Sequence, residues 1–376
     1  MAPISSLLTL GLAVLPVALA HPGHSHVEEA AERAEFVKRS PNSVRSCADQ
    51  LSRRGALEAA LTRRQEMARK VRAKRGLDSH LVRRDFAAYN FTHESTSGVA
   101  YGDDETSLFS DDSTCILQPE VTQGPYYVDG ELIRSEITDG QEGVPLYLDI
   151  QLVDTSTCEP VPAVYMDIWH CNATGVYSGV SASGNGNSDD TSNLDATFLR
   201  GIVQTDINGV AQYESIFPGH YTGRATHIHV LSHNTNDTII RTNGTVLGNN
   251  ATTTHASHVG QIFFDQDLIS LVEATAPYNT NTQELTTNAE DSILGEEAAD
   301  MDPFVEWIQL GDDITDGVMA WISIGIDPTA DDEITSAATI YKDGGVANEN
   351  SGMGGGPGGE GPGGNGTMPT GAPPMA

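Results

Sequence analysis

His227 and His229 stand two residues apart in a segment whose composition favours a β-strand. Because successive side chains of a strand point to opposite faces, both imidazoles should leave the same face of a sheet. That arrangement is typical of metal ligands, and imidazole suits zinc, copper, iron and nickel, so the pair alone does not select the metal. A surface pair of histidines without a ligand role is the alternative interpretation.

Two tyrosines follow turn-forming residues and could join the histidines. Tyr221 comes after a Pro-Gly turn, six residues before His227, where a loop could bring its phenol over the same face. Tyr177 ends a loop that contains Gly175 and follows the strand-like residues 164–169. Taken alone, each tyrosine is better explained by core or loop packing, so the case for a site depends on the combination.

The elements that must position these residues are short strands. Strand-like segments occupy residues 146–153, 164–169, 201–205, 225–231 and 260–264. A strong turn signal, Asp-Ile-Asn-Gly at residues 206–209, precedes a further short strand. Because the segment has no alternation of strands with helices, we expect an all-β fold with an antiparallel β-sandwich core over residues 118–330.

The charge of the chain is strongly negative and unevenly distributed. Asp and Glu number 52 against 20 Lys and Arg, which gives a formal net charge of -32. Most of the basic residues precede Asp85, so the N-terminal part is positive and the remainder is very acidic. Such a surface repels nucleic acid and anionic membranes, and we expect neither as a partner.

Residues 1–20 predict a signal peptide, and we therefore expect a secreted, extracellular protein. Residues 7–20 are apolar, too few to span a bilayer, and end in the small-x-small pattern that signal peptidase cuts. N-glycosylation motifs begin at Asn90, Asn172, Asn236, Asn243, Asn250 and Asn365. In an oxidising compartment the four cysteines permit two disulfides, whose pairing stays open: Cys47, Cys115, Cys158 and Cys171.

Residues 21–84 form a basic segment, within which residues 43–75 predict a helix. It carries dibasic pairs at Lys38-Arg39, Arg53-Arg54, Arg63-Arg64, Lys74-Arg75 and Arg83-Arg84. Two interpretations stay open: a pro-segment removed after Arg84 by a dibasic protease, or a helix whose basic face pairs permanently with the acidic body. Residues 85–117 follow as a linker or N-terminal arm, and the Gly/Pro-rich residues 344–376 predict a disordered tail.

Over residues 118–328 the chain resembles the intradiol ring-cleavage dioxygenases, in particular their secreted fungal branch, which is similar to catechol and protocatechuate dioxygenases. The motifs that carry the resemblance occur in the family's order: Met166-Asp167-Ile168, Gly175-Val176-Tyr177, Thr205-Asp-x-Asn-Gly209, Pro218-Gly-x-Tyr221 and Arg224-x-x-His-Ile-His229. In combination they are much more specific than any single piece.

The resemblance implies a non-haem Fe(III) site and a reaction of catechol-type rings with O2 that yields muconate-type diacids. By matching positions, the iron would be held by Tyr177, Tyr221, His227 and His229, with Arg224 and Gln261 beside it as catalytic residues. Tyr221 would also act as an internal base and leave the metal when substrate binds, since its loop is expected to be the more mobile one. A noncatalytic secreted glycoprotein on the same β-sandwich, binding aromatics or cell-wall material, is the alternative; the oligomeric state stays open.

The ligand set agrees with the preferences of a ferric ion. A free phenol has a pKa of about 10, but a trivalent cation at bonding distance favours the phenolate by far more than this difference from neutral pH. Two phenolates and a hydroxide would neutralise Fe(III), and hard anionic oxygen donors disfavour its reduction to Fe(II). We therefore expect the iron to stay ferric.

Overall fold

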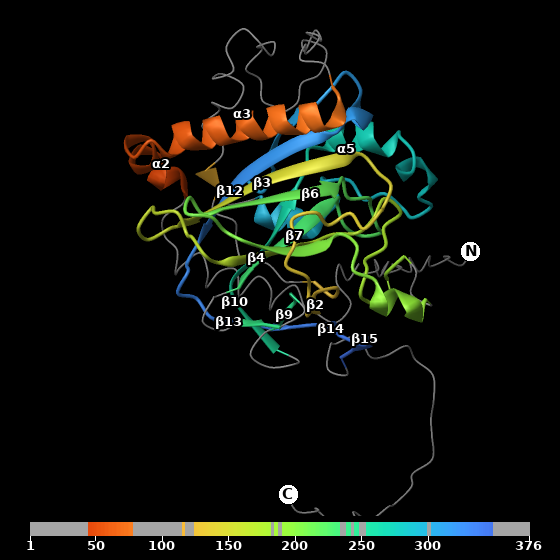
Figure 1. Ribbon diagram of the computed structural model, residues 1–376. Helices are drawn as coiled ribbons and strands as arrows, with labels where there is room; N and C mark the ends of the chain where they lie inside the picture. The colour runs from red at the N-terminus through yellow and green to blue at the C-terminus, as the bar shows by residue number, and fades with distance from the viewer. Residues whose placement is uncertain are drawn as a thin grey trace, which may run out of the picture.

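Two five-stranded sheets form the body of the protein (Figure 1). The computed structural model describes residues 44–77, 115–116, 124–181, 184–186, 190–233, 238–241, 244–247, 253–298 and 302–348. The first sheet contains β1 (Cys115–Ile116), β12 (Val318–Ile326), β3 (Pro145–Asp154) and β6 (Val210–Ile216) in that order, with β11 (Glu306–Gln309) beside β12. The second sheet contains β13 (Asp332–Thr335), β10 (Thr253–Phe263), β7 (His227–His233), β4 (Tyr165–Trp169) and β5 (Arg200–Gln204).

Smaller elements complete the part of the chain that the structure describes. A three-stranded sheet joins β15 (Gly344–Ala347), β14 (Ala338–Tyr341) and β2 (Val128–Asp129), and β8 (Ile239–Ile240) pairs with β9 (Val246–Leu247). The helices are α2 (Val44–Arg53), α3 (Ala56–Arg75), α5 (Gln266–Glu273) and α6 (Ser292–Glu297), with 3-10 turns η3 (Thr191–Asp195), η4 (Tyr278–Thr280) and η5 (Ile314–Asp316). None of these described helices is long and apolar enough to cross a membrane.

The two large sheets share one hydrophobic core. Leu148 and Ile150 of β3 and Ile228 and Val230 of β7 belong to it, each 0% exposed. Because strand side chains alternate, these residues place their sequence neighbours on the outer faces of the two sheets. Burial of each such aliphatic side chain contributes roughly 1.5–3 kcal/mol before entropy is counted, so this core anchors both layers.

The prediction of a β-rich fold is confirmed, but the sheets are mixed rather than purely antiparallel. β12 pairs with β3 in parallel along its whole length, and β1 with β12 and β14 with β2 are also parallel pairs. Parallel neighbours need a long crossover connection, and here β3 and β12 are separated by most of the domain. Alternation within a strand shows which residues face the core but not the direction of the neighbouring strand.

Helices α2 and α3 cover the outer face of the first sheet, where α3 lies across β12, β3 and β6 (Figure 1). This cover explains why the inner positions of β3 are buried on both faces of the strand. Trp321 and Met319 of β12 and Tyr147 of β3 pack against Ala68 and Val71 of α3.

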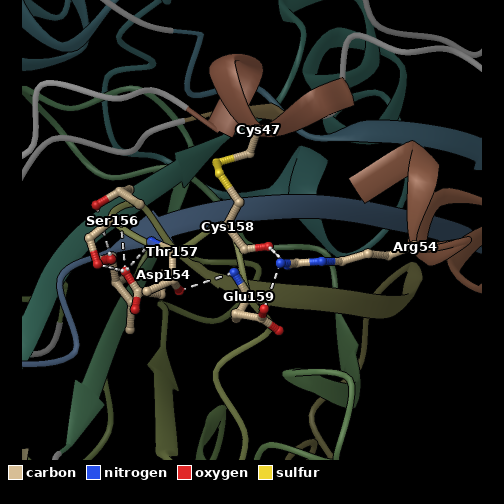
Figure 2. Close-up of a disulfide and its surroundings, with 9 residues drawn as sticks. Cys47, Arg54, Asp154, Ser156, Thr157, Cys158 and Glu159 are labelled. Atoms are coloured by element: carbon tan, nitrogen blue, oxygen red, sulfur yellow. Dashed lines mark hydrogen bonds and ion pairs between the residues drawn. A yellow bond between two sulfur atoms is a disulfide. The ribbon is translucent and has the colours of Figure 1, made fainter. Parts of the chain in front are cut away.

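A disulfide joins α2 to the turn after β3, as Figure 2 shows. Cys47 and Cys158 are bonded across 111 residues of sequence, with their Cα atoms 5.3 Å apart. Cys171 is a free, buried thiol. The side chain of Cys115 lies outside the described residues, so of the two disulfides that the cysteine count allows, the structure pairs one.

The folded part continues past residue 330 into the Gly-rich end of the chain. The prediction that disorder begins at residue 344 is wrong, because β15 pairs with β14 there. Gly345 donates its N–H to Asp195 Oδ1 at 2.9 Å, and its Cα approaches the carbonyl oxygen of Leu194 so closely that no Cβ would fit. Glycine is therefore used for close backbone approach rather than flexibility. The signal peptide expected at residues 1–20, most of the expected linker and residues 349–376 lie outside the described residues.

Candidate metal centre

Strand β7 presents both histidines on the outer face of the second sheet. His227 and His229 are each 1% exposed, whereas the intervening Ile228 points into the core. In the register of the sheet, His229 lies opposite Trp169 of β4 and Gln261 of β10. The prediction that both imidazoles leave the same face agrees with this arrangement, which depends only on the strand repeat of two.

The four predicted ligands come together at one point. His227 Nε2 lies 3.1 Å from His229 Nε2, 3.4 Å from Tyr221 Oη and 3.5 Å from Tyr177 Oη. The two tyrosines also interact with each other, with ring centroids 5.6 Å apart in an edge-to-face arrangement. Two imidazole nitrogens and two phenol oxygens therefore surround a space that one cation could share.

Each of the two imidazoles makes a further contact that fixes its orientation. His227 Nδ1 lies 2.6 Å from the carbonyl oxygen of Ala225, so Nδ1 carries the proton and donates it, which leaves the lone pair of Nε2 facing the tyrosines. The indole of Trp169 stacks on His229 with ring centroids 4.8 Å apart and planes only 2° from parallel. Both rings are thus held before any ligand arrives.

Tyr177 is held by its backbone in the loop after β4. Its N–H donates to Asn185 Oδ1 at 2.8 Å, and its carbonyl accepts from the Asn185 and Asn193 amides at 2.8 and 2.7 Å. Gly175 takes a φ of 79°, a left-handed conformation that glycine adopts without strain, and so turns the chain back toward the sheet. These contacts bring a residue from outside any strand over the histidines.

The loop that carries Tyr221 is anchored as firmly as that of Tyr177, which removes the argument that it is the more mobile one. His220 Nδ1 lies 2.8 Å from Glu273 Oε1, and its Nε2 lies 3.0 Å from the carbonyl oxygen of Gln283. A Cβ at Gly219 would meet backbone oxygens of the Tyr177 loop at 2.5 Å, so the two loops pack backbone to backbone. Any departure of the Tyr221 phenol must come from rotation of its side chain.

Arg224 and Gln261 lie together beside the tyrosines. Arg224 donates through Nη2 to Gln261 Oε1 and through Nε to Asp291 Oδ2 at 3.0 Å, and all three residues are almost completely buried. Asp291 also accepts from the N–H of Ala225 at 2.8 Å and from the first N–H groups of α6. One carboxylate therefore fixes the arginine and the entrance to β7 at the same time.

Sequence reasoning did not identify Asp291 or Tyr126 as part of the site. Tyr126 stacks on Tyr177 with ring centroids 4.6 Å apart and meets Tyr221 edge-on at 6.2 Å. Tyr126 follows a Gly-Pro turn, the same kind of signal that drew attention to Tyr221, so a search for turn-then-tyrosine patterns would have found it. Asp291 offers no comparable signal for its role in the site, since Arg224 and Ala225 are more than 60 residues away in sequence.

The chemistry of the donor set fits a hard, highly charged cation. Burial raises the pKa of both phenols, Tyr177 most strongly, although the charge of Arg224 lowers it in each case. Without a cation both side chains are therefore neutral, whereas a trivalent ion at bonding distance would reverse that preference. In the part of the chain that is described, no group of three or more His, Cys, Asp or Glu side chains could hold a metal, so the phenols are essential to the site.

A buried acid cluster lies on the same sheet face, beyond the histidine pair. Asp167 Oδ2 contacts His233 Nε2 at 3.1 Å, and Glu131 Oε1 accepts from Arg200 at 2.9 Å. Burial raises the pKa of Asp167 to about 7 and that of Glu131 well above its ordinary value. Both carboxyl groups therefore keep their protons at pH values at which exposed carboxyl groups have lost them.

Comparison with known proteins agrees with this geometry. Residues 121–292 match the family model described as Dioxygenase, a region that contains all four predicted ligands together with Arg224, Gln261 and Asp291. No curated protein shows significant similarity to the chain.

A structural search matches several solved structures to part of the chain. An intradiol ring-cleavage dioxygenase from Tetranychus urticae has 28% sequence identity, 57% coverage of this chain, 96% coverage of that chain and a TM-score of 0.47. For a catechol 1,2-dioxygenase from Acinetobacter sp. ADP1 these values are 17%, 56%, 62% and 0.34. For a hydroxyquinol 1,2-dioxygenase from Pseudomonas putida DLL-E4 they are 15%, 56%, 66% and 0.35. Each of these TM-scores is below 0.5, so no residue role is taken from these structures.

The acid cluster predicts a pH-dependent contribution to stability. The pKa of Asp167 is raised from the ordinary value of 3.8 to about 7 in the folded state. Its contribution to the stability of the folded state is therefore complete below pH 3.8 and is lost as the pH rises through about 7. Asp167→Asn should therefore flatten the fall in the free energy of unfolding over this range, measured by urea denaturation at several pH values. Parallel curves for the variant and the unmodified protein would show that Asp167 does not hold the proton.

The contact between Arg224 and Asp291 predicts a large effect on folding. Asp291→Ala leaves a buried guanidinium with less compensating charge and should lower the free energy of unfolding by about 3–5 kcal/mol. Arg224→Leu combined with Asp291→Ala removes both charges and should be less destabilised than the single variant. Equal destabilisation of the single and double variants in urea denaturation would contradict the charge-pair explanation.

Proposed function

We propose that the chain, whose residues 121–292 match the Dioxygenase family model, is an intradiol ring-cleavage dioxygenase, a secreted Fe(III) enzyme acting on catechol-type aromatic rings. The ring would open between its two hydroxyl-bearing carbons, and both atoms of O2 would enter a muconate-type diacid. The observation that carries the proposal is the convergence of two phenols and two imidazoles within 3.5 Å on one buried sheet face.

Tyr177, Tyr221, His227 and His229 would hold the iron, two of them as anionic phenolates and two as neutral imidazoles. When bound, Fe(III) would supply a Lewis acid that withdraws electron density from the bound ring. The neighbouring Trp169 is 0% exposed, so water has little access to this side of the site. Electrostatic interactions at this site would therefore be stronger than in water, because the local dielectric constant is low.

The chain's own groups would then handle protons and charge. Tyr221 Oη would accept a proton from a catechol hydroxyl and rotate away from His227 as substrate binds. Tyr177 would stay, because its ring is stacked against Tyr126 and is only 1% exposed, whereas the ring of Tyr221 makes edge contacts and is 6% exposed. Arg224 would stabilise negative charge on the ring as a fixed, preorganised cation.

An extracellular location is part of the proposal. The Cys47–Cys158 disulfide supports it, because such bonds persist in oxidising compartments. The signal peptide expected at residues 1–20 and the asparagines of five of the six glycosylation motifs lie outside the described residues. For an enzyme outside the cell, catechols derived from lignin and other plant phenols are the substrates that we propose.

Colour and metal content test the proposal directly. Charge transfer from tyrosinate to Fe(III) should make the purified protein wine-red, and a catechol should support oxygen uptake. A colourless protein without iron, inactive on a panel of substituted catechols, would instead favour a noncatalytic glycoprotein on the same fold.

The histidine pair predicts loss of metal without loss of fold. His227→Ala or His229→Ala should abolish iron binding and oxygen uptake together, while circular dichroism stays unchanged, because the core of the two sheets supports β7 independently. Iron content is measured by metal analysis of the purified variants. Full iron content and turnover in either variant would remove that histidine from the ligand set.

The two tyrosines predict different losses. Tyr221→Phe should retain most iron and still bind a catechol, but turnover should fall by about two to four orders of magnitude, the usual contribution of a positioned acid or base. Tyr177→Phe should lose iron affinity and the charge-transfer band even with substrate present. Anaerobic titration with a catechol, followed by absorbance in the visible charge-transfer band, checks the assignment. If substrate binding removes the absorbance due to Tyr177 while that due to Tyr221 persists, the two roles are reversed.

A further inference from the structure

Three of the five dibasic pairs lie in or directly after the helices that cover the first sheet. They are Arg53-Arg54, Arg63-Arg64 and Lys74-Arg75. If these pairs were processing sites, their side chains would have to be available to a protease in extended backbone. In the structure they instead belong to helical turns or to the turn between α2 and α3, and they contact the acidic body of the protein.

The central pair binds a buried carboxylate of the sheet. Arg63 donates from Nε and Nη2 to the two oxygens of Asp149, both at 2.8 Å, and Arg64 Nε lies 3.6 Å from the same group. Gln212 of β6 donates to Asp149 at 2.7 Å, and the guanidinium of Arg64 lies over the ring of Trp321 at 5.5 Å. Asp149 is 0% exposed, and removal of α3 would leave it on an apolar strand without its counter-charges.

Burial alone would raise the pKa of Asp149, yet its contacts with Arg63, Arg64 and Gln212 hold the pKa below the ordinary value. The carboxylate is therefore ionised at neutral pH and depends on α3 for compensation. Loss of one partner of a buried ion pair is strongly destabilising, by about 3–5 kcal/mol. The exposed contact of Lys74 with Glu214 at 2.6 Å adds much less, because water screens it.

The same interface has an apolar component and a covalent one. Ala68 and Val71 of α3 pack on Tyr147, Met319 and Trp321, and Arg72 donates to the carbonyl oxygen of Leu310. At the other end, Figure 2 shows the Cys47–Cys158 disulfide together with Arg54, which donates to the carbonyl oxygen of Cys158 at 2.8 Å and pairs with Glu159 at 2.6 Å. The helical segment is thus tied at its start by a covalent bond and along its length by buried contacts.

We propose that residues 44–77 are a permanent, disulfide-tethered cover of the first sheet, so that a cut after Arg84 would give a two-chain protein and would not release a pro-segment. The interaction surface is the outer face of β12, β3 and β6, and its partner is the basic face of α3. The pairs at Lys38-Arg39 and Arg83-Arg84 flank the helices in sequence and are the processing sites compatible with this interface. This proposal does not depend on the catalytic one, because its tests measure chain association.

The first test cuts the native secreted protein with a protease specific for dibasic pairs. Mass spectrometry should show cleavage after Arg84 with intact bonds after Arg64 and Arg75. If the Arg84 bond resists, a recognition sequence for a site-specific protease inserted after Arg84 supplies the cut. Without reductant the two fragments should co-elute in size exclusion and run as one band in a denaturing gel; with reductant the gel should show two bands. Separate elution of the N-terminal fragment without reductant would overturn the proposal.

A second test separates the contribution of the disulfide from that of the noncovalent interface of α3 to holding the cut fragment on the body. In Cys47→Ser combined with Cys158→Ser, the cut fragment should still co-elute with the body at neutral pH, held by α3. Adding Asp149→Ala to that background should release it, whereas Asp331→Ala, a matched control on an exposed carboxylate that pairs with His255, should not. Release of the fragment from the serine variant alone would show that the disulfide is its only attachment, and release in the Asp331→Ala control would show that Asp149 has no specific part.

Discussion

Compensation of buried charge is the constraint on which the rest of the structure depends. Each of three buried carboxyl groups contacts an arginine from a distant part of the chain: Asp149 with Arg63, Glu131 with Arg200 and Asp291 with Arg224. Leaving one such charge unpaired costs several times more than an exposed pair contributes. These contacts therefore determine which elements lie together: a helix on the first sheet, the β2 region on β5, and the start of α6 on the start of β7.

The two sheets separate two tasks onto opposite faces of the molecule. Their shared core lies between them, α3 covers the outer face of the first sheet, and the candidate metal centre lies on the outer face of the second. A strand repeat of two serves both tasks, because every core residue has neighbours that face outward. The core can support the histidines rigidly while the loops after β4 and β6 add the tyrosines, so metal loss and unfolding are separable events.

Burial in the candidate centre has two opposed consequences. It raises the pKa of Tyr177 and Tyr221 and so favours neutral phenols. It would also exclude water that could compete for a cation and weaken the attraction between the cation and a phenolate. The same burial requires that Arg224 be fixed by Gln261 and Asp291 rather than by solvent. Charge in the site is thus preorganised, which is the arrangement that favours stabilisation of an anionic transition state.

The local sequence pattern was sufficient to predict those features that depend on the two-residue repeat of a strand or on short motifs. Alternation predicted the strands and the common face of His227 and His229. The order of the motifs indicated the resemblance to intradiol dioxygenases and brought Tyr177 and Tyr221 into the same hypothesis. Strand direction, the single disulfide that the structure shows, and the strand at residues 344–347 could not be predicted, because each depends on a partner far away in the sequence. The position of Asp291 beside Arg224 and the anchoring of the Tyr221 loop could not be predicted for the same reason. No sequence pattern shows which arginine a given carboxylate will pair with. The pairing becomes energetically important only when the fold excludes water from both side chains.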